Sequence, residues 1–343
     1  MSEQMNPEVP PSGQMMQLMF GFIPTLAVFT AARIGVADQL KNGPQSIEAL
    51  AVATGMHAGS LRRLLRATAS VGVFSETSPG VFSQTPMSAT LCEDATDSLR
   101  SFALFWGADW HLQVWAALYD SVRLGQPAFE QIHGQPIFAW FEEHRAEAAV
   151  FNNAMTSLSK SSGVAVTQGY DFTGVGKLVD IGGGHGFMLA TIMEKYPEMQ
   201  GVLYDAPSVI AGASDFMNNA ALAGRAEAVA GDFFVSAPAG GDAYIMKHII
   251  HDWNDEDSLK ILRHCHEGMT PDGRLLVVEM VVPEGDVPAP AKFLDLEMLS
   301  FLHSFERTEA EYRELFARAG FELTRIVPTP SPYSVIEGRR KQS

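Results

Sequence analysis

The stretch that decides the fold is Lys177-Leu-Val-Asp-Ile-Gly-Gly-Gly-His-Gly-Phe187. Its apolar first half has the length of a buried strand, and the three glycines 182–184 follow it directly. A helical spacing of apolar residues continues after it through Leu189 and Ile192. The stretch therefore predicts a strand, a tight turn and a helix, with unpaired N–H groups at the helix N-terminus.

A glycine turn between a strand and a helix suits a nucleotide ligand, because backbone without Cβ atoms can lie directly against it. The dinucleotide fingerprint needs Gly or Ala three residues after its second glycine, and counting from Gly182 and Gly184 that residue is Phe187. A nicotinamide dinucleotide is therefore not expected. Asp180, at the end of the strand, would repel a pyrophosphate but suits the ammonium and sulfonium of S-adenosylmethionine. The alternative is a turn that only connects strand to helix.

The composition indicates a globular chain long enough for two domains, with 343 residues, 46% of them hydrophobic and 19% charged. Its net charge of −16 and the lack of any run of five basic residues argue against nucleic acid as a partner. Cys92 and Cys265 form no motif, which favours a reducing cytoplasm. No 18-residue apolar run and no cleavable leader are evident, so we expect neither export nor a membrane partner.

Residues 15–40 carry more apolar side chains than a helix with one solvated face can hold, and Pro24 is expected to bend this segment. Burial against a second copy of the chain would solve the problem, so we expect a homodimer. Residues 44–86 then predict two helices and a hairpin, the geometry of a winged helix. Arg62, Arg63 and Arg66 could bind DNA there, but the acidic charge favours a scaffold that does not.

From Lys177 onward, predicted strands and helices alternate, which indicates an α/β fold with a mostly parallel sheet between two layers of helices. A ligand should lie beyond the carboxyl ends of the strands. Asp205 ends the second strand and could accept hydrogen bonds from ribose hydroxyls, although an Asp-Ala-Pro turn is the alternative. Asp232 could accept from an adenine amino group, with Phe233 over the ring. His251 follows the fourth strand, where chemistry is expected.

The ordered set of motifs resembles the class I O-methyltransferases of the plant caffeate/isoflavone type and their bacterial relatives that methylate aromatic polyketides. The matching stretches are Ser121-Val122-Arg123, Pro127-Ala128-Phe129, Tyr170-Asp171-Phe172, residues 178–186, Asp205-Ala206-Pro207, Gly231-Asp232-Phe233, residues 247–253, Pro271-Asp272-Gly273-Arg274, Glu306-Arg307-Thr308 and Ala319-Gly320-Phe321. They cover nearly the whole chain.

The resemblance implies a Rossmann-like methyltransferase sheet, mostly parallel with an antiparallel last strand. Before it would come a mainly helical, winged-helix-like dimerisation domain over residues 1–98 and a helical region contributing to the substrate pocket over 99–165, leaving 166–343 as the cofactor-binding catalytic domain. The resemblance also places Gly182, Asp205, Asp232, Phe233 and Lys247 on the family's S-adenosylmethionine contacts, and Asp180 and Gly184 belong to the same turn. His251 falls on the general base, with Glu279 and Glu306 as the two carboxylates beside it.

Methyl transfer from a sulfonium is an in-line displacement, in which much of the rate comes from positioning. A neutral imidazole can take the proton of a phenol as its oxygen attacks, and a carboxylate on the far ring nitrogen would fix the tautomer. No metal ion is expected. His264-Cys265-His266 does not suggest one, because neighbouring helical side chains point about 100° apart.

The substrate is expected to be a flat aromatic small molecule, and large apolar side chains are candidates for its pocket. These candidates are Phe105, Trp106, Phe151, Met155, Met298 and Phe301, each of which could instead be ordinary core. Bacterial relatives usually carry Gly-Gly before an Arg/Lys-Glu-Arg-Thr run, whereas this chain has Leu302-His303-Ser304-Phe305-Glu306, which loses both glycines and gains Phe305. We therefore expect a stiffer, fuller loop over the substrate.

Three alternatives stay open from the sequence. The acceptor could be nitrogen rather than oxygen. Some relatives of the fold use the bound cofactor in decarboxylation or hydroxylation, but they tend to lack the base, so His251 argues against them. The chain could also be a ligand-sensing winged-helix regulator, which would bind DNA.

Overall fold

The stretch 177–187 forms strand β4 (Lys177–Ile181), a glycine turn and helix α13 (Phe187–Lys195) in the computed structural model, which describes residues 9–341. Val179 and Ile181 point to one face of the sheet and Leu178 to the other, and all three are fully buried. A strand apolar on both faces is typical of a parallel sheet covered on both sides. The prediction of strand, turn and helix is confirmed.

The sheet of this unit has seven strands in the order β6-β5-β4-β7-β8-β10-β9. The other strands are β5 (Gln200–Asp205), β6 (Ala226–Ala230), β7 (Gly241–Lys247), β8 (Met269–Glu279), β9 (Phe321–Pro328) and β10 (Ser334–Arg340). The pairs β4–β5, β5–β6, β4–β7 and β7–β8 are parallel, whereas β10 is antiparallel to both β8 and β9. This confirms a mostly parallel sheet with an antiparallel last strand. The strand order reverses at β4 and β7, where such sheets bind ligands beyond the strand ends.

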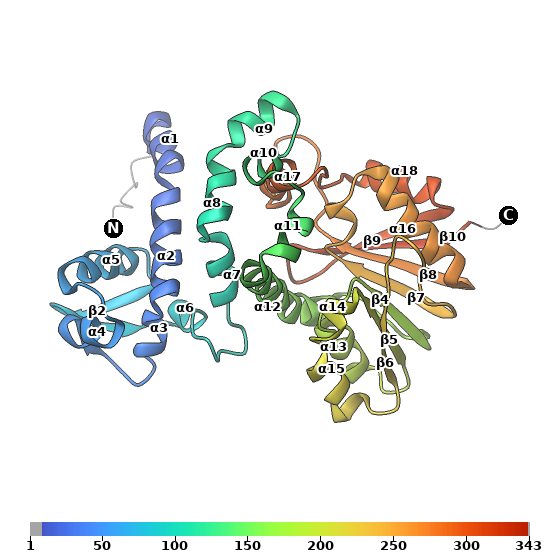
Figure 1. Ribbon diagram of the computed structural model, residues 1–343, viewed down its shortest axis with the longest axis horizontal. Helices are drawn as coiled ribbons and strands as arrows, with labels where there is room; N and C mark the ends of the chain where they lie inside the picture. Colours follow the sequence, from blue (N-terminus) through green and yellow to red (C-terminus); the bar gives the residue numbers. More distant parts are fainter. Residues whose placement is uncertain (1–8, 342–343) are drawn as a thin grey trace, which may run out of the picture. The chain divides into compact units, whose positions relative to one another are not determined.

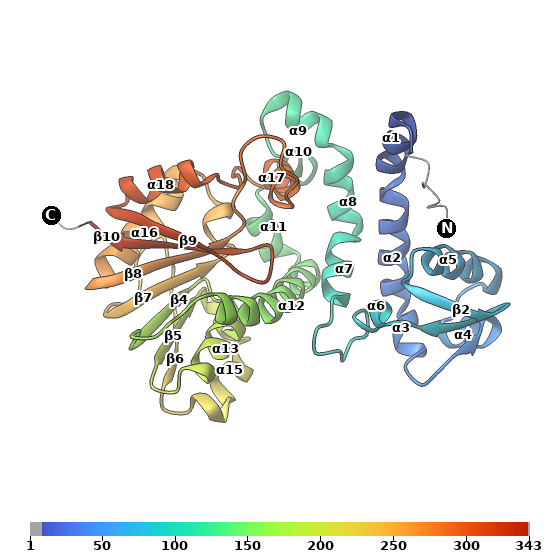
Figure 2. The ribbon, with the colours of Figure 1, turned by 180° about the vertical axis from the view of Figure 1, so that it is seen from behind.

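Helices cover both faces of the sheet (Figure 1, Figure 2). On one face, α16 (Asp255–Gly268) and α18 (Glu309–Arg318) bury their apolar sides against the strands. On the other face lie α12 (Arg145–Gly169), α13 and α15 (Ser214–Asn218). The short helices α14 (Pro207–Ile210), η1 (Ala220–Leu222) and η2 (Ile250–Asp252) follow strand ends or connect elements.

A group of short helices packs around α17 (Ala291–Phe301), a helix that was not predicted. They are α9 (Leu118–Leu124) and α10 (Ala128–His133), and α11 (Ile137–Glu143) packs in turn on α10 and α12. Phe129 of α10 lies 6.0 Å from Phe301 of α17, measured between ring centroids, and both are buried. Residues 112–343 form one compact unit, and α8 (Asp109–Ala116) leads into it from the first unit, residues 1–111. The division into 1–98, 99–165 and 166–343 stays a prediction.

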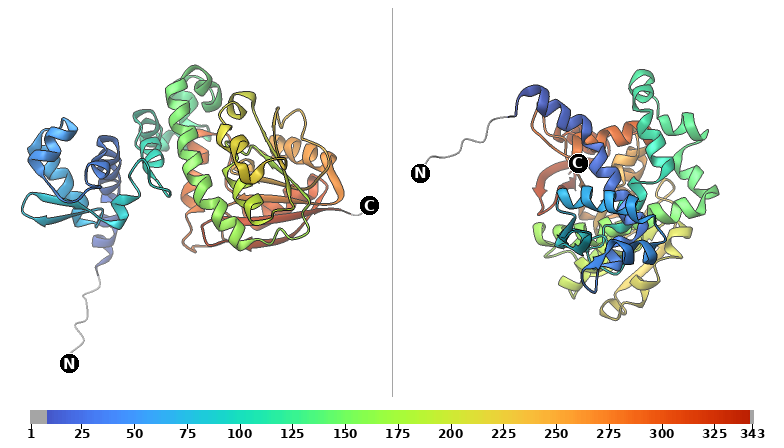
Figure 3. Two further views of the ribbon diagram at one scale, coloured as in Figure 1. Left: turned by 90° about the horizontal axis from the view of Figure 1, so that it is seen from below. Right: turned by 90° about the vertical axis from the view of Figure 1, so that its left-hand side faces the viewer.

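The first unit contains the two helices and the hairpin predicted for residues 44–86 (Figure 3, blue to cyan). They are α4 (Ile47–Thr54), α5 (Ala58–Ser70), β2 (Phe74–Ser78) and β3 (Val81–Gln84), with β1 (Gln45–Ser46) pairing with β3. The remaining helices of the unit are α1 (Pro11–Phe20), α2 (Phe22–Ile34), α3 (Val36–Gln39), α6 (Pro86–Ala89) and α7 (Arg100–Trp106). Its core includes Leu50, Leu65 and Phe82, all fully buried.

Helices α1 and α2 carry many exposed apolar side chains, including Met15, Leu18 and Phe22. The helix is interrupted at Gly21 rather than at Pro24, because Pro24 has no N–H to donate to the carbonyl four residues earlier. By length and composition, Pro11–Ile34 is a helix apolar enough to cross a membrane, a test that core helices and signal sequences also pass. This surface therefore calls for a partner, and the sequence prediction of a second copy is taken up below.

Candidate active site

The glycine turn after β4 has room for a ligand on one side only. Gly182 and Gly184 have φ values of 65° and 61°, which side chains with a Cβ atom rarely adopt. A Cβ atom on Gly182 would lie 2.3 Å from Cδ1 of Ile249, whereas one on Gly184 would meet no atom within 4 Å. The backbone at Gly184 therefore faces open space that a bound group can occupy.

Asp180 lies on β4 beneath this turn and is 1% exposed. Neither of its carboxylate oxygens has a hydrogen-bond partner among residues 9–341. Burial and the nearby charge of Asp205 raise the pKa of Asp180 to about 8, although Lys247 opposes the rise. A buried carboxyl group without a partner is unfavourable, so a cationic ligand would stabilise it as a carboxylate. These residues therefore fit the ammonium and sulfonium of S-adenosylmethionine.

Asp205, at the end of β5, connects the second strand to the glycine turn. Its Oδ2 accepts the N–H of Gly184 at 2.8 Å, and its Oδ1 accepts the N–H of Ala206 at 2.7 Å. Burial raises the pKa of Asp205, although these two N–H donors lower it. Each carboxylate oxygen has two lone pairs, so both can accept another hydrogen bond, from ribose hydroxyls for example.

The other predicted cofactor residues lie at the ends of neighbouring strands. The ring of Phe233 lies beside the turn, with its Cε1 3.7 Å from the position of a Cβ atom on Gly182. Asp232 is exposed, and its Oδ1 accepts the N–H of Phe234 at 2.8 Å. Lys247 ends β7; burial lowers its pKa to about 8, although Asp180, Asp252 and Glu279 oppose the fall.

His251 lies in the 3-10 turn η2 just after β7 and is 5% exposed. Its Nδ1 is 2.6 Å from Oε1 of Glu306, and its backbone N–H donates to Oε1 of Glu279 at 3.1 Å. Its Nε2 is 3.4 Å from Oδ1 of Asp252. The two predicted carboxylates therefore both meet His251, but only Glu306 meets the ring. Glu279 instead connects the backbone of His251 to the hydroxyl of Tyr312, which donates to its other oxygen.

The charges around His251 change its protonation. Burial lowers the pKa of its imidazole, but Glu306, Asp252 and Glu279 raise it by more, and the result is a pKa of about 10. The ordinary imidazole value is about 6.5. The stabilisation that the protonated ring gives the fold is therefore fully present below about pH 6.5 and is lost as the pH rises through about 10.

Sequence reasoning missed three residues of this region. Asp252 follows the predicted base directly, and its position in the sequence could have identified it. His248 stacks on His251, with ring centroids 4.8 Å apart, and has a φ of 56° that no local pattern reveals. Thr156 of α12 contacts the glycine turn, because its hydroxyl oxygen lies 3.0 Å from Nδ1 of His185.

The predicted pocket residues lie in several places. Phe151 is 6.4 Å from Phe138, whose ring stacks at 5.7 Å on Trp253, two residues after the candidate base. The other candidates divide between the units. Met298 and Phe301 are buried on α17, Met155 is half-buried on α12, and Phe105 and Trp106 contact each other on α7 of the first unit, 6.2 Å apart. A pocket formed by all six stays a prediction.

The segment that replaces the usual two glycines is anchored by contacts on both sides. Nε2 of His303 lies 3.2 Å from Oε1 of Glu130 on α10. The ring of Phe305 lies 4.4 Å from the guanidinium carbon of Arg307. A glycine at position 303 could not make the contact with Glu130, and these two side chains tie the segment before Glu306 to its surroundings.

Two family models match the chain. The O-methyltransferase domain matches residues 115–322, and the O-methyltransferase dimerisation domain matches residues 16–94. The first match contains every predicted catalytic and cofactor residue. The second contains the exposed helix α2 and the two-helix and hairpin unit.

Individual relatives match nearly from end to end. The phenazine O-methyltransferase PhzM of Lysobacter antibioticus is 41% identical, over 96% of this chain and 97% of its own length. The 8-amino-8-demethylriboflavin N,N-dimethyltransferase of Streptomyces davaonensis is 34% identical, over 91% and 90%. Among solved structures, a calicheamicin biosynthesis methyltransferase with S-adenosylhomocysteine bound superposes with a TM-score of 0.86 at 34% identity, covering 96% of this chain and 97% of that one.

Proposed function

This chain belongs to the O-methyltransferase family, and on that premise we propose that it methylates the phenolic hydroxyl of an aromatic small molecule, with His251 as the general base. The family assignment makes it an enzyme that uses S-adenosylmethionine. The observation that carries the proposal is the 2.6 Å contact between Nδ1 of His251 and Glu306. It fixes the ring so that Nε2 is the nitrogen left to take a proton.

S-adenosylmethionine, when bound, supplies a methyl group on a positively charged sulfur. The chain's own residues supply the rest. Gly184 leaves space at the turn, Asp205 offers acceptors for the ribose, and Asp180 offers a negative charge to the cation. His251 takes the phenol proton as the oxygen attacks, and Glu306 stabilises the imidazolium that forms.

The raised pKa of His251 bears on this role. With a pKa of about 10, the ring is protonated at neutral pH and cannot accept a proton. A cation at the glycine turn would lower that pKa, because a like charge disfavours the imidazolium. A phenol titrates near 10, so an imidazole whose pKa has been lowered takes the proton only as the phenol oxygen attacks. Base catalysis is therefore expected only in the enzyme that has bound its cationic cofactor.

Asp205→Ala should weaken binding of S-adenosylhomocysteine by about 10- to 100-fold, because a charged acceptor of hydrogen bonds is lost. The same change also removes the acceptor of the Gly184 N–H, which donates to Asp205 in the wild-type chain. Isothermal calorimetry measures the affinity. Asp215→Ala, an exposed carboxylate of α15, is the matched control and should bind normally. An unchanged affinity in Asp205→Ala would remove the ribose contact from the account.

The test of the proposed reaction is a panel of hydroxyphenazines, dihydroxynaphthoic acids and simple phenols with S-adenosylmethionine. We expect one phenol to gain the mass of one CH2 on oxygen. The same panel should contain aromatic amines, because an N,N-dimethyltransferase is among the relatives and nitrogen is the second candidate acceptor. Methylation of amines alone would replace the O-methylation proposal, and decarboxylation or hydroxylation without mass gain of CH2 would reject both.

We propose that the exposed apolar face of α1 and α2 packs against a second copy of the chain. The match of residues 16–94 to the O-methyltransferase dimerisation domain supports this partner. A cytoplasmic homodimer that binds neither nucleic acid nor membrane is the form that we expect to be active. The net charge of −16 supports the lack of DNA binding.

A further inference from the structure

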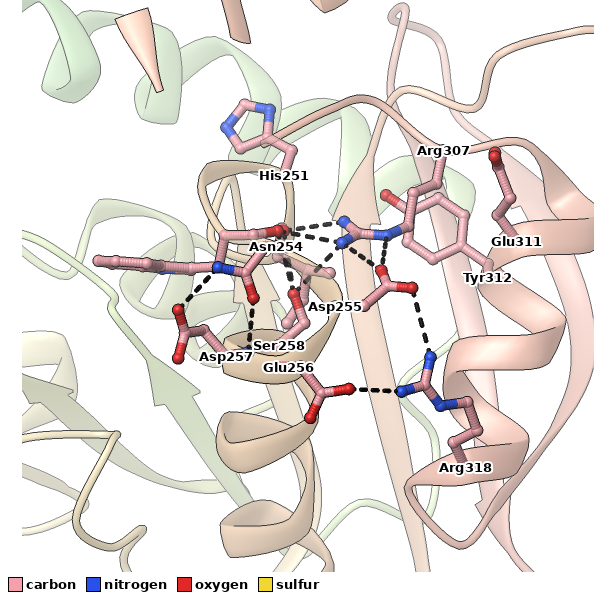
Figure 4. Close-up of polar contacts among 12 residues, drawn as sticks. His251, Asn254, Asp255, Glu256, Asp257, Ser258, Arg307, Glu311, Tyr312 and Arg318 are labelled. Carbon is pink, nitrogen blue, oxygen red and sulfur yellow. Dashed lines mark hydrogen bonds and ion pairs between the residues drawn. The ribbon is translucent and has the colours of Figure 1, made fainter. Parts of the chain in front are cut away.

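Arg307 is the largest fully buried side chain among the described residues, and it bonds both to the turn that carries His251 and to the start of α16. Its Nη1 donates to the carbonyl of Ile250 at 2.9 Å, and its Nη2 donates to the carbonyl of Trp253 at 3.0 Å. Asp255 accepts from Nε at 3.2 Å and from Nη2 at 2.9 Å, and Oγ of Ser258 is 3.4 Å from Nη2. Figure 4 shows the guanidinium between the start of α16 and the turn.

The two carbonyls stand immediately before and two residues after the candidate base. A guanidinium can reach both at once, because its donors lie in one rigid plane and diverge. A lysine ammonium is a single point and could not reach both carbonyls and Asp255 with the same geometry. A buried arginine also needs a counter-charge, which Asp255 provides.

Arg307 directly follows Glu306, the residue that holds the His251 ring. The backbone of this pair is itself anchored, since the N–H of Glu306 donates to Asp295 at 2.8 Å and the carbonyl of Arg307 accepts from Val282 at 3.0 Å. One short segment thus contacts the catalytic turn twice, at the ring and at the backbone.

We infer that Arg307 is a positioning residue for methyl transfer, which fixes the backbone of the His251 turn while Glu306 fixes the ring. The inference rests on the proposed function, because it assumes that His251 is the base. It gives Arg307 a role in the rate of the reaction beyond its contribution to stability. The competing explanation is that Arg307 only joins α16 to the segment before α18 through Asp255.

Arg318 separates the two explanations. It also pairs with Asp255, whose Oδ2 lies 3.4 Å from its Nη1, and with Glu256 at 2.8 Å, so it joins α18 to α16 (Figure 4). Within residues 9–341 its guanidinium donates to Asp255 and Glu256 and to neither carbonyl of the turn. R318K therefore makes the same exchange of guanidinium for ammonium beside the same aspartate and leaves the turn in place.

The experiment compares R307K, R318K and H251A with the wild-type enzyme, using S-adenosylmethionine and the phenol accepted from the panel. R307K should lower kcat by about 10- to 100-fold, as small misplacements of a catalytic group do. The KM for the phenol and the affinity for S-adenosylhomocysteine should stay near wild type. The acid limb of the pH–rate profile should move to lower pH, since a displaced His251 loses part of its contact with Glu306. R318K should keep the wild-type kcat and profile.

Equal kcat values for R307K and R318K, with only a lower thermal midpoint in each, would overturn the inference. If R307K does not fold, S258A replaces it, because Oγ of Ser258 lies 3.4 Å from the carbonyl oxygen of Ile250 and 3.3 Å from that of Trp253. S258A should lower kcat and shift the profile in the same direction, and an unchanged profile would again overturn the inference. H251A separates a failure of the proposed function from a failure of the inference about Arg307. Full turnover in H251A rejects the proposed function. An inactive H251A together with wild-type kcat in R307K rejects the role of Arg307 alone.

Discussion

Replacing His251 with alanine should lower kcat for the accepted phenol by about 10²- to 10⁴-fold, the range that general bases contribute. Affinity for S-adenosylhomocysteine should stay near wild type, because the cofactor residues Gly184 and Asp205 bond to each other and not to His251. Steady-state methylation kinetics measure the first quantity and calorimetry the second. The large effect follows from the position of the ring, whose Nδ1 is occupied by Glu306 and whose Nε2 alone can act.

His144→Asn is a suitable control for this variant. His144 stacks on Trp140 with ring centroids 3.9 Å apart at the start of α12, and its Nδ1 lies 2.8 Å from the carbonyl oxygen of Trp140. Loss of that imidazole should leave kcat and cofactor affinity unchanged. If H251A instead lost cofactor affinity and turnover to the same extent, His251 would be a binding residue rather than the base.

Glu306→Gln should lower kcat by about 10²- to 10³-fold, because the neutral amide cannot stabilise the imidazolium that forms during transfer. Glu306 raises the pKa of His251, so its removal lowers that pKa and moves the acid limb of the pH–rate profile to lower pH. The measurement is kcat over a range of pH with saturating S-adenosylmethionine.

Glu130→Gln is the matched control, since it removes a carboxylate that pairs with another histidine, His303, at 3.2 Å. It should leave the pH–rate profile in place. A Glu306→Gln enzyme with wild-type kcat and the wild-type profile would show that the 2.6 Å contact with His251 has no part in the reaction.

Local patterns were sufficient for most of the sheet. β4 was recognised from an apolar run followed by glycines, and the alternation of strands and helices after it indicated the parallel sheet. Helix α17 was missed because Pro283, Gly285, Pro288 and Pro290 precede it and indicate a loop. The helix bends where Pro24 was expected to bend it, with the break at Gly21 because the proline has no N–H for the carbonyl four residues earlier.

Sequence motifs indicated candidate residues for the site but not how these residues bond to one another. His251, Glu279 and Glu306 were named from motifs, yet the two carboxylates stand 27 positions apart and no spacing tells which of them meets the ring. The pKa of His251 depends on three carboxylates from separate segments, so composition could not give it. Arg307 bonds to residues that stand 49 to 57 positions before it in the chain. A local sequence pattern cannot predict contacts over such separations.

The most direct test of the central claim is a crystal structure with S-adenosylhomocysteine and the accepted phenol bound. We expect the ribose hydroxyls on Asp205, the sulfur facing the phenol oxygen, and that oxygen within hydrogen-bond distance of Nε2 of His251. A cofactor bound away from the glycine turn, or a phenol oxygen out of reach of the imidazole, would contradict the account.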